Sequence, residues 1–355
     1  MYFKNKIIKL LKNLIKKQFF SSDENFSHLR IGVIGAGIQG SILSSLVEDS
    51  GAKIVAVHDT NLLRARKLKL LRKAELATDK LEEFFKIKMD GLLLCTMPKI
   101  RIEPIKMACQ NNIHLLVEKP AAYDVEEGQK CYSLIKNSNI ISSVGFQLRY
   151  EPRYERLKEI IKGHKIHLVR TVCTVDYFLN YRMPDWYLKD DLSGGPIAEQ
   201  AIHLLDIARY VLGNPKATNV ASFGTRNMEI EKKEYDSLNA VQLMYHLDNQ
   251  VIGVHTNHSG HENTYFDLEL IGPHIRIYAN ASEKNICGII NGKKINELTP
   301  EKTHSGLNKI TAWLKAIKTG DKKYIKSDFL EALNTQSLID ASIKSQKKNN
   351  VISIT

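Results

Sequence analysis

Lys119 has a setting that suggests proton-transfer chemistry. It lies in Glu118-Lys119-Pro120, directly after an apolar run, 114–117, which is typical of a buried strand. In an open parallel sheet, ligands bind beyond the carboxyl ends of the strands, so Lys119 is predicted to lie beside a bound cofactor. A partly desolvated lysine at such a place acts as a general acid or base. The alternative is an exposed lysine in a loop closed by proline.

A second group of polar side chains falls in a predicted helix, 197–212. Glu199 and His203 are four residues apart and share a face of that helix, and Asp206 flanks His203 three residues later. A histidine held by a carboxylate suits proton transfer, because the acid sets its tautomer and basicity. The alternatives are a surface ion pair and a core histidine whose hydrogen bonds are satisfied.

A glycine-rich turn near the start of the chain has the spacing of a dinucleotide site. Gly35, Gly37 and Gly40 follow an apolar run, 31–34, and open an amphipathic helical pattern. Gly35 permits a tight turn, Gly37 lets the backbone approach a diphosphate, and Gly40 lets the helix pack closely on the sheet. The helix N-terminus then offers N–H groups to the phosphates. A glycine-rich turn without a ligand is the alternative.

Asp59 bears on the choice of cofactor. It ends the next predicted strand, 54–58, and follows Gly40 by 19 residues. A carboxylate there accepts hydrogen bonds from both ribose hydroxyls and repels a 2′-phosphate, so the sequence favours NAD over NADP. Arg64 and Arg66 follow closely and weaken this preference, so NADP stays open.

Other candidate groups of side chains are weaker. His255 and His258 point to opposite faces of a strand, so these two and His261 do not predict a metal site. The five cysteines are scattered without a CxxC pair, which favours free thiols over disulfides or zinc. An aromatic stretch either stacks on a sugar ring or packs at a strand edge; it comprises Tyr177, Phe178, Tyr181, Trp186 and Tyr187.

The first half of the chain alternates between strand and helix patterns. This alternation is typical of a doubly wound parallel sheet, here a Rossmann α/β domain with helices on both faces. The predicted strands are 31–34, 54–58, 91–95, 114–117 and 141–145, and the predicted helices are 38–48, 61–72, 101–111 and 124–137.

The second half indicates an α+β domain with a largely antiparallel sheet. A run rich in Val, Thr and aromatic residues, 165–178, begins it, and two hairpins are predicted around Asp248-Asn249 and Gly272-Pro273. Helices are expected at 197–212, 305–318 and 326–346. We therefore expect an extension at 1–28, a nucleotide-binding domain at 29–148 and a substrate and oligomerisation domain at 149–355.

The N-terminal segment carries much of the positive charge. The chain has 355 residues, 43% hydrophobic residues and a net charge of +12. Residues 1–20 contain six lysines and no acid, and they predict a basic amphipathic helix. Such a helix lies on an anionic membrane or docks on protein, but it is too polar to be a signal peptide or to span a bilayer. Basic patches with interleaved aromatics are missing elsewhere, so no nucleic-acid partner is expected.

Together these motifs resemble the Gfo/Idh/MocA family of oxidoreductases, which includes glucose–fructose oxidoreductase and inositol dehydrogenases. The resemblance covers about residues 29–355. The matching residues are the turn Gly35–Gly40, Cys95-Thr96-Met97-Pro98, Glu118-Lys119-Pro120, Gly145 to Tyr150, Ser193-Gly194-Gly195 through His203 to Asp206, Trp313, Ile317, Gly320, Ser327-Asp328-Phe329 and Ala332.

The resemblance implies hydride transfer between NAD(P) and a ring alcohol of a sugar, sugar nucleotide or cyclitol. It implies that Lys119 is the general acid/base, with His203 as its partner at the substrate hydroxyl and Glu199 in support. The residues it implies at the cofactor are Gly35, Gly37, Ile38, Gln39, Gly40, Asp59, Arg64, Thr96, Pro98 and Glu118, with Glu118 near the nicotinamide ribose. Those expected at the substrate are Lys119, Gln147, Arg149, Trp186, Gln200 and His203.

Two departures from the family pattern put the substrate in doubt. The family's acid four residues before the histidine is usually Asp and here is Glu199, and the residue after Gly145-Phe146 is commonly Asn and here is Gln147. The resemblance implies a homodimer or homotetramer. The free cysteines indicate a reducing compartment, so we expect a cytoplasmic protein, and peripheral membrane contact through residues 1–20 stays open. A cofactor-binding sensor or regulatory subunit on the same fold is the alternative function.

Overall fold

The computed structural model describes residues 25–176, 186, 189–227, 236–280, 284–299 and 304–354. The predicted basic helix at 1–20 lies outside the described residues. The same holds for the aromatic stretch apart from Trp186, namely Tyr177, Phe178, Tyr181 and Tyr187.

The first domain is a six-stranded parallel sheet in the order β3-β2-β1-β4-β5-β6. It confirms the predicted doubly wound sheet, and every predicted strand and helix there begins and ends within one residue of its expected place. The additional β3 and α4 are too short to show a periodic pattern. The elements are β1 Arg30–Ile34, α2 Ile38–Asp49, β2 Lys53–His58, α3 Leu62–Arg72, β3 Leu76–Thr78, α4 Leu81–Phe84, β4 Gly91–Leu94, η1 Pro98–Ile100, α5 Ile102–Gln110, β5 His114–Val117, α6 Val125–Lys136 and β6 Ser142–Val144.

The second domain is built on a nine-stranded sheet in the order β14-β13-β12-β11-β7-β10-β9-β8-β15. Among the described strands of this sheet, only β7 and β10 pair in parallel, and the two predicted hairpins are confirmed as β9–β10 and β11–β12. The strands are β7 Leu168–Thr174, β8 Ala217–Thr225, β9 Ala240–Leu247, β10 Ile252–His258, β11 Tyr265–Gly272, β12 Ile275–Asn280, β13 Asn285–Ile290, β14 Lys293–Leu298 and β15 Ile352–Ser353.

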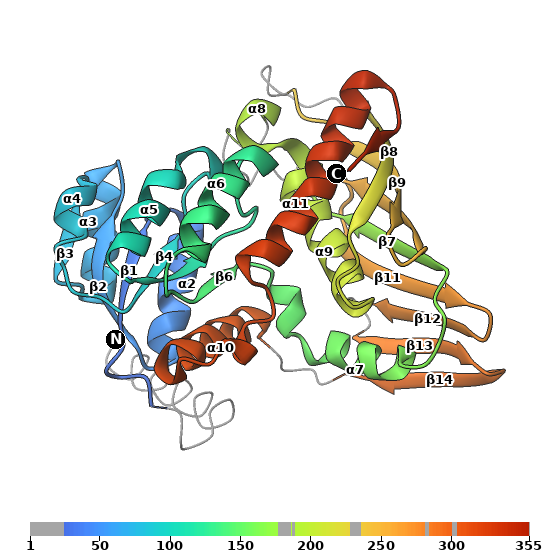
Figure 1. Cartoon of the computed structure of the whole chain (residues 1–355), viewed down its shortest axis with the longest axis horizontal. Coiled ribbons are helices and arrows are strands. Elements are labelled where there is room, and N and C mark those ends of the chain that lie inside the picture. Colours follow the sequence, from blue (N-terminus) through green and yellow to red (C-terminus); the bar gives the residue numbers. More distant parts are fainter. Residues whose placement is uncertain are drawn as a thin grey trace.

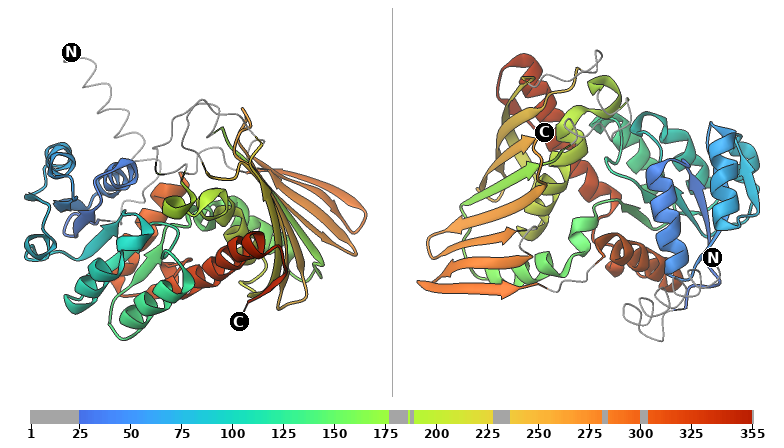
Figure 2. Two further views of the ribbon diagram at one scale, coloured as in Figure 1. Left: turned by 90° about the horizontal axis from the view of Figure 1, so that it is seen from above. Right: turned by 180° about the vertical axis from the view of Figure 1, so that it is seen from behind.

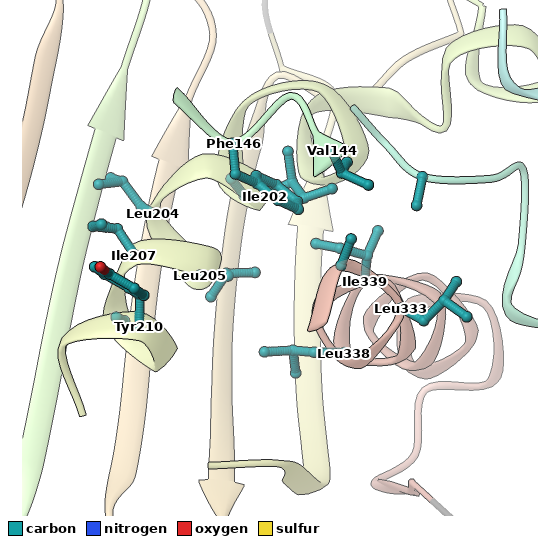
Figure 3. Packing of buried hydrophobic residues seen from close by; sticks show 14 of the residues in the cluster. Val144, Phe146, Ile202, Leu204, Leu205, Ile207, Tyr210, Leu333, Leu338 and Ile339 are labelled. Atoms are coloured by element: carbon teal, nitrogen blue, oxygen red, sulfur yellow. The ribbon is translucent and has the colours of Figure 1, made fainter. Parts of the chain in front are cut away.

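Helices α7, α9 and α11 lie on one face of the large sheet (Figures 1 and 2). Leu204 and Ile207 point from α9 toward the strands, while Leu205 points toward Leu338 of α11 (Figure 3). This apolar layer fixes α9 between the sheet and α11, and so positions the side chains at its N-terminal end. The elements are η2 Gln147–Tyr150, α7 Pro152–Ile161, α8 Asp190–Ser193, η4 Ile197–Ala201, α9 Ile202–Val211, α10 Ser305–Thr319, η5 Lys322–Tyr324 and α11 Phe329–Lys348.

Two segments join the core of the first domain from outside its predicted range. Trp313 of α10 is fully buried, and a Cβ added to Gly91 of β4 would lie 2.8 Å from its ring. Helix α10 lies beside α2 in Figure 1. Phe26 is 1% exposed, although the composition of its segment indicates a linker. The nucleotide-binding domain therefore includes packing from chain before 29 and after 148.

The predicted continuous helix 197–212 is wrong at its first turn. Residues Ile197–Ala201 form a π-helix, η4, and the α-helix α9 starts only at Ile202. A π-helix has i→i+5 hydrogen bonds, so side chains four apart no longer stack as they do in an α-helix. Such turns frequently occur at functional sites.

Candidate active site

Lys119 and Glu199 form an ion pair between the two domains. Lys119 follows β5, and its Nζ lies 2.7 Å from Glu199 Oε2 and donates to the Glu199 carbonyl oxygen at 2.8 Å. The two side chains are 13% and 7% exposed. Because Glu199 comes from η4, the π-helix directs both its carbonyl and its carboxylate at the lysine. The pair fixes the Lys119 ammonium at the boundary between the domains.

His203 is not held by either carboxylate predicted beside it. Glu199 turns to Lys119, and the Asp206 carboxylate accepts two bonds from Arg149, at 2.6 and 2.7 Å. The ring of His203 is partly exposed and meets the Phe146 ring edge-on, with centroids 6.5 Å apart. Desolvation lowers the pKa of His203 well below its ordinary value, and the charges of Lys119 and Lys309 lower it further. His203 is therefore a neutral imidazole at pH 7, able to exchange a hydrogen bond with a hydroxyl.

Lys309 is a second cation at this site that the sequence motifs did not indicate. It lies on α10, is 1% exposed, and its Nζ is 3.2 Å from Glu118 Oε1. The other carboxylate oxygen of Glu118 accepts the Lys119 backbone N–H at 3.2 Å. A Cβ at Gly145 would lie 2.9 Å from both oxygens, so glycine leaves room for this carboxylate. The sequence did carry one signal for a buried Lys309: it lies four residues before Trp313, on the apolar face of α10.

Arg101 ties together the two loops that carry the site. Its buried guanidinium donates to the carbonyls of Thr96, after β4, and of Glu118 and Pro120, after β5. Burial lowers the pKa of Arg101 to about 10, so the group stays charged at neutral pH. These bonds hold the backbone on both sides of Lys119. No local pattern pointed to Arg101, because its partners lie on other loops.

The glycine turn has the shape that a dinucleotide needs. A Cβ at Gly40 would lie 1.9 Å from the Gly35 carbonyl oxygen, so α2 packs against the turn only because residue 40 is glycine. Gly35 has φ +96°, a left-handed conformation that favours glycine. A Cβ at Gly37 would meet nothing within 4 Å among the described atoms, and no side chain caps the α2 N-terminus there. Open backbone N–H groups beside free space fit a diphosphate.

Polar groups around this turn fit the rest of such a cofactor. The Asp59 carboxylate, at the end of β2, accepts the N–H groups of Ala36 and Asn61 at 2.7 and 2.8 Å. It is thereby fixed beside the turn, where a ribose would be recognised. The buried hydroxyl of Thr96 has no hydrogen-bond partner within the described part of the chain. Ile38, Gln39 and Arg64 are exposed, whereas Pro98 is buried.

The expected substrate residues fall in different environments. Arg149 is 0% exposed and is bonded to Asp206 and to the Lys326 carbonyl, so its guanidinium has no access to a substrate. The expectation that Arg149 binds substrate is therefore wrong in this structure. Gln147 is exposed at the start of η2, Trp186 is half-buried, and Gln200 is buried next to Glu199 on η4.

Neither a cluster of metal ligands nor a membrane-spanning helix is found among the described residues. Within the described ranges, no three His, Cys, Asp or Glu side chains gather as metal ligands would. His255 lies buried in the sheet, with Nδ1 2.8 Å from the Thr171 hydroxyl. No helix in the part of the chain that the structure describes is long and apolar enough to cross a bilayer.

Comparison with known proteins shows similarity to sugar and cyclitol dehydrogenases. D-glucoside 3-dehydrogenase of Escherichia coli K12 is 26% identical over 245 residues, which cover 66% of this chain and 68% of that protein. Inositol 2-dehydrogenase of Rhizobium meliloti is 26% identical over 220 residues, which cover 60% and 64%. The chain thus spans about two thirds of the length of these curated relatives.

The fold is shared with a solved dehydrogenase. A levoglucosan dehydrogenase in complex with NADH and levoglucosan superposes with a TM-score of 0.81 and 18% identity, over 92% of this chain and 99% of that one.

Sequence models of one family match both domains. Residues 29–146 match "Oxidoreductase family, NAD-binding Rossmann fold", and residues 154–280 match "GFO/IDH/MocA C-terminal domain". The two matches follow the domain order of that family and cover well over half of the sequence. The chain therefore belongs to the Gfo/Idh/MocA family of oxidoreductases.

Proposed function

We propose that this protein is an NAD(P)-dependent dehydrogenase or reductase. It interconverts a secondary ring alcohol and a ketone on a sugar, sugar nucleotide or cyclitol, with NAD the preferred cofactor because of Asp59. The observation that carries the proposal is the Lys119–Glu199 pair beside His203, directly after β5 of the nucleotide-binding sheet. Family membership and the named relatives support the substrate class.

Lys119 is the proton-transfer group of the proposed reaction. An ammonium has three N–H donors, and two of them go to the Glu199 carbonyl and carboxylate. The third is available to a substrate oxygen. In alcohol oxidation the neutral amine accepts the hydroxyl proton, and in ketone reduction the ammonium returns it to the oxygen. The bound nicotinamide supplies the hydride acceptor or donor.

His203 and the local charges assist at the same oxygen. The neutral imidazole accepts or donates a hydrogen bond and so orients the hydroxyl toward Lys119. Positive charge from Lys119 stabilises the oxygen as it becomes an alkoxide. Glu199 keeps the lysine in place, so the longer side chain that replaces the family's usual Asp still reaches its partner, at 2.7 Å.

The decisive experiment combines a substrate panel with Lys119→Met. Nicotinamide absorbance is followed with free sugars, inositols and nucleotide-linked sugars, each with NAD and NADP. We expect turnover on at least one member, a roughly 10²–10⁴-fold fall in kcat for Lys119→Met, and unchanged NAD affinity. Lys106→Met, on an exposed part of α5, is the matched control.

Two results would contradict the proposal. Turnover that survives in Lys119→Met would remove the lysine from the chemistry. Tight NAD binding by the wild-type protein without turnover on any panel member would favour the sensor or regulatory role instead.

We also propose a cytoplasmic homodimer or homotetramer. All five cysteines are free thiols, as expected in a reducing compartment. The open face of the nine-stranded sheet supports self-association. Contact of residues 1–20 with an anionic membrane belongs to the same proposal, and their deletion is expected to weaken co-sedimentation with anionic vesicles.

A further inference from the structure

Helix α3 exposes leucine side chains along its outer face. Leu63, Leu70 and Leu71 are 73%, 78% and 58% exposed, whereas Ala65 and Leu68 face the core. Leu63 and Leu70 are seven residues apart, with Lys67 between them, and so form one stripe along the helix. Single exposed leucines are ordinary, but three on one short helix form an apolar surface that needs a reason.

The same helix is strongly basic. Between Asn61 and Ala74 the chain has six cations and no acid; they are Arg64, Arg66, Lys67, Lys69, Arg72 and Lys73. Residues 1–20 hold six further lysines and no acid. These twelve cations equal the entire net charge of +12, so the rest of the chain is electrically balanced. The excess charge is concentrated in two segments, each of which combines cations with leucine or isoleucine.

The positive charge of α3 limits which kind of partner can cover its exposed leucines. A second copy of α3, or the basic segment 1–20, would bring cations against cations, which opposes packing. Nucleic acid would satisfy the cations but would leave the leucine stripe in water. An anionic lipid surface satisfies both, because its headgroups attract the cations while leucines enter the headgroup and acyl boundary.

We propose that the outer face of α3 docks on an anionic membrane surface. The helix lies at the edge of the first domain farthest from the nine-stranded sheet (Figure 1). Docking there leaves the Lys119 site and the open sheet face accessible. The catalytic proposal above does not depend on this contact.

Vesicle co-sedimentation of the full chain tests the proposal. Vesicles of phosphatidylglycerol and phosphatidylcholine are compared with vesicles of phosphatidylcholine alone. Leu70→Gln removes one apolar anchor, and Leu298→Gln, at an 83% exposed leucine of β14, is its control. Lys67→Gln with Lys73→Gln removes two exposed cations, and Lys106→Gln with Lys130→Gln matches the change in net charge.

We expect binding to the anionic vesicles only. The two-cation variant should bind about tenfold or more weakly, Leu70→Gln should bind several-fold more weakly, and both controls should bind as the wild type does. Dehydrogenase turnover in solution should be unchanged in every variant. Equal binding by the α3 variants and their controls, or no binding by the wild type, would overturn the proposal. Loss of cations with no effect of Leu70→Gln, together with tight binding of duplex DNA, would favour nucleic acid.

Discussion

At the scale of single residues, the site depends on buried charge placed by long-range contacts. Lys309 and Glu118 are 191 residues apart in the chain, yet their charged groups lie 3.2 Å apart. A buried ion pair contributes little net stability unless its remaining bonds are satisfied. Here the pair lies against the backbone of Lys119, and the charge of Lys309 lowers the pKa of His203. Its role is therefore electrostatic as well as structural.

Lys309→Met should change how activity depends on pH. Loss of this cation raises the pKa of His203 toward its ordinary value, because one cause of its depression is removed. Protonation of His203 then begins at higher pH, so the acid-side fall of kcat/KM moves to higher pH. The measurement is kcat/KM from pH 5 to 9.

Two further variants separate electrostatics from packing. Lys309→Arg keeps the charge and should restore the wild-type profile, and Lys318→Met changes an exposed lysine of the same helix. A uniform loss of activity in Lys309→Met, with no shift of the profile, would show that Lys309 acts only through packing.

At the scale of elements, the glycines between β1 and α2 have two roles: Gly40 lets α2 pack against the turn, and Gly37 leaves room for the diphosphate. Two substitutions separate these roles. Gly40→Ala places a methyl group 1.9 Å from the Gly35 carbonyl oxygen, so α2 must move. We expect the free energy of unfolding to fall by about 1–3 kcal/mol, and NAD affinity to fall as well. Gly37→Ala adds a methyl group in open space, so it should lower the unfolding free energy by no more than about 1 kcal/mol, the cost of alanine at a helix N-cap, while weakening NAD binding. Denaturant unfolding and NAD titration by fluorescence measure both quantities. Unchanged NAD affinity in Gly37→Ala would place the diphosphate elsewhere.

Helix α9 is fixed by the ion pair between Arg149 and Asp206. The sequence had suggested other roles for both residues, Arg149 at the substrate and Asp206 beside His203. Arg149 of η2 donates twice to Asp206 of α9, and Thr335 of α11 donates to the same carboxylate. All three groups are buried. This network sets the position of α9, and therefore of His203 one turn earlier. Arg149 and Asp206 thus support the site through the packing of η2, α9 and α11.

At the scale of the whole molecule, the outer face of the nine-stranded sheet is the expected oligomer interface. It exposes Phe223 and Met244 at 65% and 52%, and its centre holds Glu269 between Arg170 and Arg276, each 2.8 Å away. We expect a dimer or tetramer by size-exclusion chromatography with light scattering. Phe223→Lys with Met244→Lys should shift the protein to a smaller species, because cations would be buried without partners. A wild-type monomer, or an unchanged assembly in the variant, would contradict this.

Local sequence patterns were sufficient to predict much of the fold and the part of the site that the first domain supplies. The glycine turn, Asp59 and Lys119 each follow a strand of the first domain, and parallel strands bring their carboxyl ends to one edge. The short β3 and α4 and the strands β8, β13 and β14 were not predicted, because they are short or only partly buried and carry weak periodicity. Helix α7 was also not predicted, although its buried Tyr154, Leu157 and Ile161 recur at helical spacing.

The part of the site that the second domain supplies could not be predicted from the spacing of residues in the sequence. An α-helical pattern placed Glu199 beside His203, but the π-helix η4 turns Glu199 toward Lys119. A single π turn has no strong sequence signature, because its residues also suit an α-helix. The buried positions of Arg101 and Lys309 depend on loops and a helix that meet only after the chain has folded.

The sequence by itself determined the class of this protein, because turn geometry, strand–helix alternation and the order of motifs are local properties of the chain. It predicted a nucleotide site at the glycine turn and a preference for NAD, and it placed Lys119 directly after a strand, where the structure has it. Only the tertiary structure decided the partners of each charge: Glu199 with Lys119, Asp206 with Arg149, and Lys309 with Glu118. Ion pairs are set by distance in space, and these residues are 80, 57 and 191 positions apart in the chain.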